Sequence, residues 1–246
     1  MSIRLSIWDT YVNPDSESDY PVKIYFGDLG KFLTDVKIDT LDKILKYACS
    51  RAKVNFLKTI NLTIHQVELF IDKDPNLKLI YLVRDPRAVL SSQMRYGEFA
   101  PSAINTYSKT FCGIMLKDIQ GYVKLKKTHP NQVTFVRYED IAHKPIPLTE
   151  DLYNFVGLPL PQNVKSHIHN ITTGGNDEDC PLCISKSNST KAAEKWRLHV
   201  MDDFVQMVDF NCKDVYQYVG YLPILKASSL RDMNVPVLTD HSHELI

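Results

Sequence analysis

The sequence has 246 residues, of which 44% are hydrophobic and 24% are charged. These proportions are ordinary for a globular protein, and the length is sufficient for one sizeable α/β domain. The 29 lysines and arginines balance the 29 aspartates and glutamates, so the composition gives no support to a nucleic-acid coat or a polybasic membrane-binding protein. Any site for an anion must therefore be local.

No stretch of the sequence has the pattern of a membrane span or a secretory signal. A span needs about 18 apolar residues in a row, and residues 1–9 lack the apolar core of a signal peptide. We therefore expect a soluble chain without an export signal. Three N-glycosylation sequons, at Asn61, Asn170 and Asn188, are a weak sign of a lumenal compartment, because such triplets also arise by chance.

The first part of the chain is weakly patterned. Residues 1–37 are rich in turn formers, and we expect an irregular lead-in. The glycine pair within 27–31 follows no convincing strand and has no serine or threonine cluster, so it does not predict a phosphate-binding loop. Residues 39–51 have the apolar spacing of a helix, and 54–57 are expected to form a short strand that ends at Lys58.

The stretch from residue 79 to residue 92 carries the clearest local signal. The apolar run Leu79–Val83 is typical of a strand buried on both faces in a parallel sheet. Asp85 is a good helix N-cap and Pro86 suits the first helical position. The sequence therefore predicts strand, tight turn and helix, with Arg84 at the carboxyl end of the strand, where open α/β sheets bind ligands. Ser92 follows about two helical turns into the helix.

Arg84 and Ser92 can reach one anion together from these positions. A guanidinium group matches the oxygens of a phosphate in a fork, and a serine hydroxyl adds another donor. The alternative is that Arg84 and Asp85 form a surface ion pair after an ordinary core strand, which would have little functional meaning.

The rest of the chain alternates between helices and one more strand. Residues 132–136 predict a second buried strand, and it ends in the acidic turn Arg137–Asp140. Residues 172–188 are expected to form a long surface loop. Helices are predicted over 62–71, 107–127, 148–156, 162–170, 191–197 and 204–219.

The five cysteines leave at least one unpaired within a monomer. Cys180 and Cys183 have the spacing of half a zinc site, but no second cysteine pair lies at zinc-ribbon spacing, and His167, His169 and His199 are not grouped as finger ligands. A loop disulfide or two free thiols are the alternatives, and the redox state of the compartment decides between them.

Four ordered blocks give the chain a resemblance to a known family. Arg84-Asp-Pro-Arg-Ala-x-x-x-Ser92 resembles the 3′-phosphate-binding motif of the Golgi carbohydrate sulfotransferases, which use 3′-phosphoadenosine 5′-phosphosulfate (PAPS). Three other blocks also resemble this family, in the same order: Leu57–Thr59, Arg137–Asp140 and Lys195–Arg197. For the Arg137–Asp140 turn, the resemblance favours a structural role over a catalytic one. In the last of these blocks, Trp196 is expected in the core and not as a stacking ligand.

The resemblance implies an α/β fold with a three-layer parallel sheet, the P-loop-like sulfotransferase fold. It implies an irregular lead-in over 1–37, a partial sulfotransferase domain over 38–223 and a polar tail with few anchors over 224–246. The implied reaction moves a sulfuryl group from PAPS to a sugar hydroxyl without a metal. The implied acceptor is a glycan or proteoglycan, including glycosaminoglycans, and the implied location is the Golgi lumen, for a glycoprotein that can form a homodimer.

The resemblance also assigns roles to three side chains. Arg84 and Ser92 would bind the 3′-phosphate of PAPS, and Lys58 would face the sulfuryl group during its transfer. The general base does not carry over, because Ile60 stands where the cytosolic sulfotransferases have a histidine.

One part of the family pattern has no counterpart in this sequence. The first strand and the glycine- and serine-rich loop that binds the 5′-phosphosulfate are missing, so we expect a chain cut at its N-terminus that binds PAPS-type nucleotides weakly or not at all. If the start is genuine, the chain would be cytoplasmic. Two other hypotheses remain open: a non-catalytic remnant that binds glycans or a full-length enzyme, and an unrelated nucleotide-binding α/β protein, against which the lack of a Gly-x-x-x-x-Gly-Lys-Ser/Thr loop argues.

Overall fold

The computed structural model describes residues 6–7, 24–25, 47, 50–51, 54–60, 62–175 and 185–240. The chain divides into two units, Met1–Thr63 and Ile64–Ile246, and each is described by itself. None of the helices in these described ranges combines the length and the apolar character that a membrane span needs.

The first unit contains a small antiparallel ladder. β1 (Ser6–Ile7) pairs with β2 (Ile24–Tyr25), so the lead-in predicted over 1–37 is not wholly irregular. The glycine pair within 27–31 and most of the helix predicted over 39–51 lie outside the described residues.

The short strand predicted over 54–57 does not form. These four residues have no regular secondary structure, and the neighbouring Lys58 takes part in an isolated bridge. The prediction failed because a strand gains its stability from packing against neighbours, whereas Phe56 is 73% exposed and Leu57 is 61% exposed.

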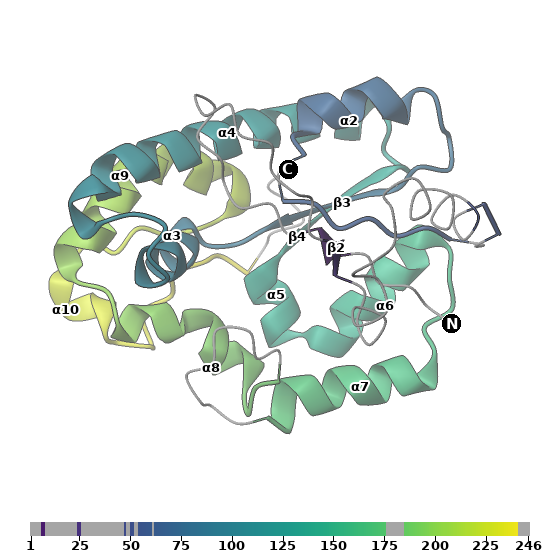
Figure 1. The fold of residues 1–246 in the computed structure, drawn as a ribbon. Coiled ribbons are helices and arrows are strands. Elements are labelled where there is room, and N and C mark those ends of the chain that lie inside the picture. Colours follow the sequence, from purple (N-terminus) through teal and green to yellow (C-terminus); the bar gives the residue numbers. More distant parts are fainter. Residues whose placement is uncertain are drawn as a thin grey trace, which may run out of the picture. The chain divides into compact units, whose positions relative to one another are not determined.

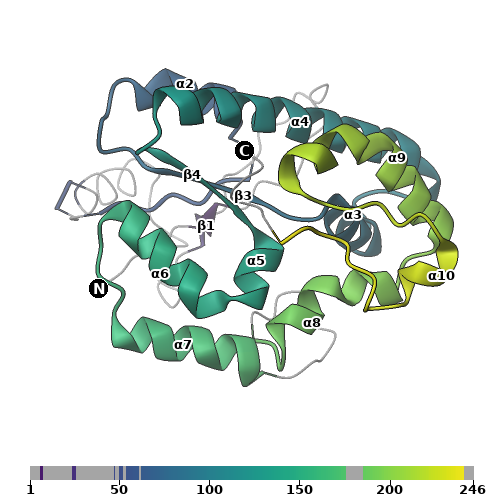
Figure 2. The ribbon, with the colours of Figure 1, turned by 180° about the vertical axis from the view of Figure 1, so that it is seen from behind.

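The second unit is built around two parallel strands. β3 (Leu79–Val83) pairs with β4 (Val133–Arg137) in a register that places Val83 beside Arg137. Helices lie on both sides of this pair (Figures 1 and 2). On one side are α2 (Ile64–Ile71), α4 (Ile104–Thr128) and α9 (Asp202–Val219), and on the other are α5 (Tyr138–His143), α6 (Pro145–Val156) and α7 (Gln162–Thr173). The predicted α/β fold with a parallel sheet is confirmed in this form, while the larger three-layer sheet stays a prediction.

The helices predicted for the second unit are confirmed, with small shifts of their ends. The helix predicted over 191–197 is divided into α8 (Ser189–Glu194) and η3 (Lys195–Leu198). Gly157 and Gly220 end α6 and α9 in the left-handed conformation, each with a φ of 73°, which glycine adopts without steric cost. The remaining elements are α3 (Pro86–Arg95), η2 (Pro101–Ala103) and α10 (Ala227–Leu230).

β3 is not buried on both of its faces, contrary to the prediction. Leu82 is 52% exposed, whereas Val83 is buried. Successive side chains of a strand point to opposite faces. Tyr81, on the same face as Val83, stacks on Tyr122 of α4 with ring centroids 5.8 Å apart. The helix therefore covers the face that carries Tyr81 and Val83, and the face that carries Leu82 is covered less completely.

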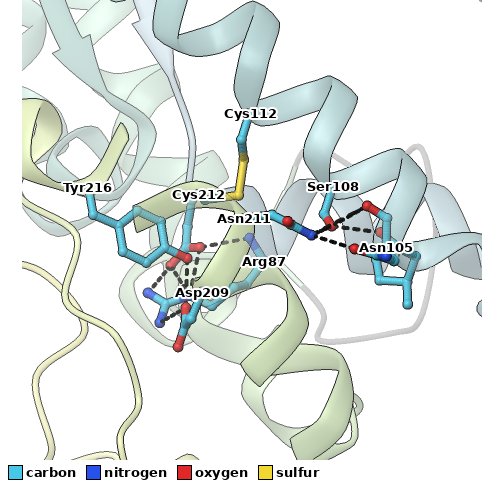
Figure 3. The surroundings of a disulfide bond; sticks show 10 residues. Arg87, Asn105, Ser108, Cys112, Asp209, Asn211, Cys212 and Tyr216 are labelled. Atoms are coloured by element: carbon cyan, nitrogen blue, oxygen red, sulfur yellow. Dashed lines mark hydrogen bonds and ion pairs between the residues drawn. A yellow bond between two sulfur atoms is a disulfide. The ribbon is translucent and has the colours of Figure 1, made fainter. Parts of the chain in front are cut away.

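A disulfide joins the two long helices of the second unit. Cys112 of α4 bonds to Cys212 of α9, and the two Cα atoms are 5.2 Å apart (Figure 3). The two residues are 100 positions apart in the sequence, and a cross-link that closes a loop of this size removes about 4–5 kcal/mol of chain entropy from the unfolded state. Next to the disulfide, the side-chain amide of Asn211 donates a hydrogen bond to the hydroxyl of Ser108 at 2.8 Å. The sequence left the disulfide pairing open.

The residues after α9 return to the core instead of leaving it. We call residues 221–240 the C-terminal segment. Tyr221 pairs with Leu238 in an isolated antiparallel bridge, and Ile224, Leu230 and Val237 are buried. The sequence predicted a polar tail with few anchors over 224–246. The structure differs over 224–240, because these three apolar side chains pack into the core, and residues 241–246 lie outside the described residues.

Three buried arginines hold the C-terminal segment by its backbone. Arg87 donates to the carbonyl of Leu222 at 2.9 Å, and Arg137 donates to that of Thr239 at 2.8 Å. Arg197 donates to four carbonyls, those of Ser229, Leu230, Asp232 and Val235. Each guanidinium is completely buried, so these charge-assisted hydrogen bonds replace the water that the groups lose on folding.

Candidate functional site

The candidate site lies where β3 and β4 end side by side. Because Val83 pairs with Arg137 in a parallel ladder, Arg84 and Tyr138 follow at the same edge of the sheet. The Asp85 carboxylate accepts the backbone N–H of Arg87 at 2.9 Å and caps α3, with Pro86 as its first residue. The predicted strand, turn and helix are therefore confirmed.

Arg84 has no acceptor for its N–H groups among the described residues. Its guanidinium carbon lies 4.6 Å from the centroid of the Tyr138 ring, and its Nε atom is buried without a hydrogen-bond partner. Asp85, the ion-pair partner that the sequence offered as an alternative, is bound by Arg87 at 2.8 Å. The simple reading of Arg84 and Asp85 as a surface ion pair is therefore wrong.

Arg87 is the residue that sequence reasoning missed in this turn. Its guanidinium forms ion pairs with Asp85 at 2.8 Å and Asp209 at 3.2 Å, and it lies over the rings of Trp196 and Tyr216. Burial alone would lower the pKa of Arg87, but Asp85, with the other anionic groups beside it, raises that pKa above the ordinary value. Arg87 therefore stays charged and fixes the turn. The Asp85-x-Arg87 spacing was the only local signal for it.

Glu139 fixes the same turn from the other strand. One carboxylate oxygen accepts the backbone N–H of Asp85 at 3.0 Å, and the other accepts the hydroxyl of Tyr221 at 2.8 Å. Burial, together with the nearby charge of Asp85, raises the pKa of Glu139. Glu139 thus joins the ends of both strands to the C-terminal segment, a structural contact like the one expected for the Arg137–Asp140 turn.

Asp209 of α9 completes this buried network. Its carboxylate accepts the hydroxyl of Tyr216 at 2.7 Å and the backbone N–H of Ile224 at 2.8 Å, besides binding Arg87. Burial raises the pKa of Asp209, and the neighbouring Arg87 acts in the opposite direction. Together with Glu139, the network binds the backbone of Asp85 and Arg87, directly after Arg84.

Of the other two predicted site residues, Ser92 lies in the same unit as Arg84 and Lys58 lies in the other unit. Ser92 is half-buried on α3, and its hydroxyl makes no hydrogen bond with Arg84 among the described residues. Lys58 belongs to the first unit, where it is exposed. A shared role of these three residues stays a prediction. Trp196 is buried in the core, as expected.

Other candidate features lie away from this strand edge. A surface hollow of about 370 Å³ is lined by residues of α6 and α7, and neither Arg84 nor Ser92 is among them. In the described part of the chain, no three His, Cys, Asp or Glu side chains gather as a metal site. Cys180 and Cys183, which the sequence offered as half of a zinc site, lie outside the described residues.

Comparisons with known proteins agree with the motifs in the sequence. The family model for the sulfotransferase domain matches residues 42–220. Carbohydrate sulfotransferase 1 of Danio rerio is 28% identical over 211 residues, which are 78% of this chain and 50% of that protein. The human carbohydrate sulfotransferase 1 is 28% identical over 210 residues, or 78% and 51% of the two chains. The human carbohydrate sulfotransferase 3 is 29% identical over 216 residues, or 78% and 44%. The chain therefore spans about half the length of these relatives.

Proposed function

The chain belongs to the sulfotransferase family, and we propose that it moves a sulfuryl group from PAPS to a hydroxyl group of a carbohydrate. The observation that carries this proposal is the state of Arg84. It lies at the end of a parallel strand, and its buried Nε has no acceptor among the described residues. A buried N–H group without a partner is rare in folded proteins, and a ligand that accepts the hydrogen bond explains it.

The chemistry of Arg84 suits a phosphate group. Arg87, Arg137 and Arg197 direct their N–H groups at protein oxygens, whereas Arg84 keeps a planar set of donors that matches a phosphate in a fork. Arg84, with the hydroxyl of Ser92, would therefore hold the 3′-phosphate of the nucleotide. This contact orients the donor without taking part in bond making.

Sulfuryl transfer is an in-line displacement in which negative charge develops on the peripheral oxygens, as in phosphoryl transfer. The bond from sulfur to the acceptor oxygen forms as the bond to the leaving phosphate oxygen breaks. Lys58 would stabilise the developing charge, and no residue is assigned as the base that takes the proton of the acceptor hydroxyl. The residues that would hold the nucleotide are cationic and hydroxyl side chains, and we propose a transfer that uses no metal.

We also propose a glycan or proteoglycan acceptor and a location in the Golgi lumen. The named relatives are carbohydrate sulfotransferases, which supports a carbohydrate as the acceptor. The Cys112–Cys212 disulfide supports an oxidising compartment, because disulfides persist in secreted and lumenal proteins and are rare in the cytosol.

Calorimetric titration with 3′,5′-adenosine bisphosphate tests the proposal. Arg84→Ala removes a charge-assisted phosphate contact and should weaken binding by about 1.5–3 kcal/mol, or about 10- to 150-fold. Lys117→Ala is the matched control, because it removes an exposed positive charge from α4 and should leave binding unchanged. If the folded parent chain does not bind the nucleotide, the proposal fails, and a non-catalytic binding or partner protein becomes the better hypothesis.

A further inference from the structure

We infer that Tyr138 is a positioning residue that holds the guanidinium of Arg84 in the orientation needed to bind a phosphate; this inference rests on the proposed function. The guanidinium carbon of Arg84 lies 4.6 Å from the centroid of the Tyr138 ring. Among the described residues, no hydrogen bond or ion pair orients the Arg84 side chain instead. We therefore assign its orientation to the face of the ring.

The ring can orient the guanidinium without using its N–H groups. A cation–π contact uses the face of the guanidinium, whereas the N–H donors lie in its plane and point outward. A carboxylate partner would also fix Arg84, but it would accept the hydrogen bonds that a phosphate needs. An aromatic ring is thus a support that leaves the donors available to a ligand.

The nearby carboxylates are already engaged with other groups. Both oxygens of Asp85 accept hydrogen bonds from Arg87. The two oxygens of Glu139 accept from the backbone of Asp85 and from the hydroxyl of Tyr221. Because these carboxylates already accept hydrogen bonds from other groups, they do not bind Arg84, and its guanidinium lies on the face of the Tyr138 ring.

The backbone on both sides of Tyr138 is fixed. Arg137 binds both oxygens of Asp140 at 2.8 Å and the carbonyl of Val219 at 3.0 Å, and Glu139 is tied to the turn at Asp85. Both neighbours are buried. The backbone that carries the Tyr138 ring is therefore held by buried contacts on both sides. A binding site that depends on the orientation of a side chain needs such support.

Tyr138→Leu and Tyr138→Phe are the variants that test this role. Leucine removes the aromatic face, and a cation–π contact of the usual strength corresponds to a loss of about 3- to 30-fold in affinity for 3′,5′-adenosine bisphosphate. Phenylalanine keeps the face and loses only the hydroxyl, so its affinity should stay within about twofold of the parent. Thermal melting of each variant separates loss of binding from loss of folding.

A double-mutant cycle shows whether Tyr138 acts through Arg84. If it does, Tyr138→Leu should have little further effect in an Arg84→Ala background, where the group that it orients is gone. Tyr138→Met serves as a second variant without a ring, should leucine disturb packing.

The outcomes distinguish this inference from the proposed function. Parental affinity in Tyr138→Leu, or an equal loss in Tyr138→Phe, overturns the role of Tyr138 while the nucleotide site stands. A large drop in melting temperature for both Tyr138→Leu and Tyr138→Met also overturns it, because the residue would then be structural. Absence of binding by the folded parent chain is instead the failure of the proposed function.

Discussion

Arg84 and Arg87 are three residues apart in the chain, yet their guanidinium groups have opposite surroundings. Arg87 is completely buried and binds two carboxylates, Asp85 and Asp209, together with carbonyls of the C-terminal segment. Arg84 is half-buried, rests on the ring of Tyr138 and has no acceptor among the described residues.

The difference between the two arginines shows what makes a charged residue structural or functional. A guanidinium whose donors all bind protein oxygens holds the fold together and has nothing left for a ligand. A guanidinium that is oriented by a ring keeps its donors for another molecule. Residue type is the same at both positions, so the distribution of acceptors around each side chain decides its role.

The largest loss of stability should come from replacing Arg87, the buried arginine of the two. Arg87→Met leaves the carboxylates of Asp85 and Asp209 buried without their cation, which should cost about 3–5 kcal/mol of unfolding free energy. Arg84→Met is the matched control and should cost less than about 1 kcal/mol, because no ion pair is broken. Urea denaturation of both variants measures the difference, and equal losses would contradict the different roles of the two arginines.

A smaller loss of stability is expected from a substitution in the C-terminal segment, which Arg87 binds. Ile224 is 4% exposed, and the next residue, Leu225, is 87% exposed. Ile224→Ala should cost about 2–4 kcal/mol, because it leaves a cavity in the core. Leu225→Ala should stay within about 0.5 kcal/mol of the parent. If the two variants melt alike, the segment does not pack as described.

The pH dependence of stability tests the buried network at Glu139. The pKa of Glu139 is raised above its ordinary value of 4.5, chiefly by burial. The folded state therefore keeps a proton that the unfolded state releases, and the contribution of this group to stability falls as the pH rises above 4.5. Glu139→Gln should flatten that part of the curve of unfolding free energy against pH. Glu98→Gln removes an exposed carboxylate and serves as the control for the loss of one negative charge.

The smallest effect is expected for Ser92, the second residue predicted to bind the 3′-phosphate. Ser92→Ala should weaken binding of 3′,5′-adenosine bisphosphate by about 2- to 10-fold, as expected for one hydroxyl hydrogen bond, and should leave the melting temperature unchanged. Ser91→Ala changes the neighbouring half-buried serine of α3 and should have no effect on binding. Equal affinities of the Ser92→Ala variant and the parent would remove Ser92 from the site.

The helices and helix ends that the sequence predicted correctly depend on interactions between near neighbours in the chain. Asp85 and Pro86 start α3, Gly157 and Gly220 end α6 and α9, and the apolar spacing of residues 107–127 predicts the long helix α4. Caps, left-handed glycines and helical periodicity act within a few residues. The strand predicted over 54–57 failed because a strand depends on partners far away in the chain.

The contacts of the candidate site and the disulfide join residues that are far apart in the sequence, so they depend on the tertiary structure. Glu139 accepts the backbone N–H of Asp85, 54 residues earlier in the chain, and Cys112 bonds to Cys212, 100 residues later. The contact between Arg84 and the ring of Tyr138 depends on the register between β3 and β4, which the sequence does not specify. Arg87, Arg137 and Arg197 bind the C-terminal segment through backbone carbonyls. Every residue carries such a carbonyl, so the sequence does not show which residues these arginines bind.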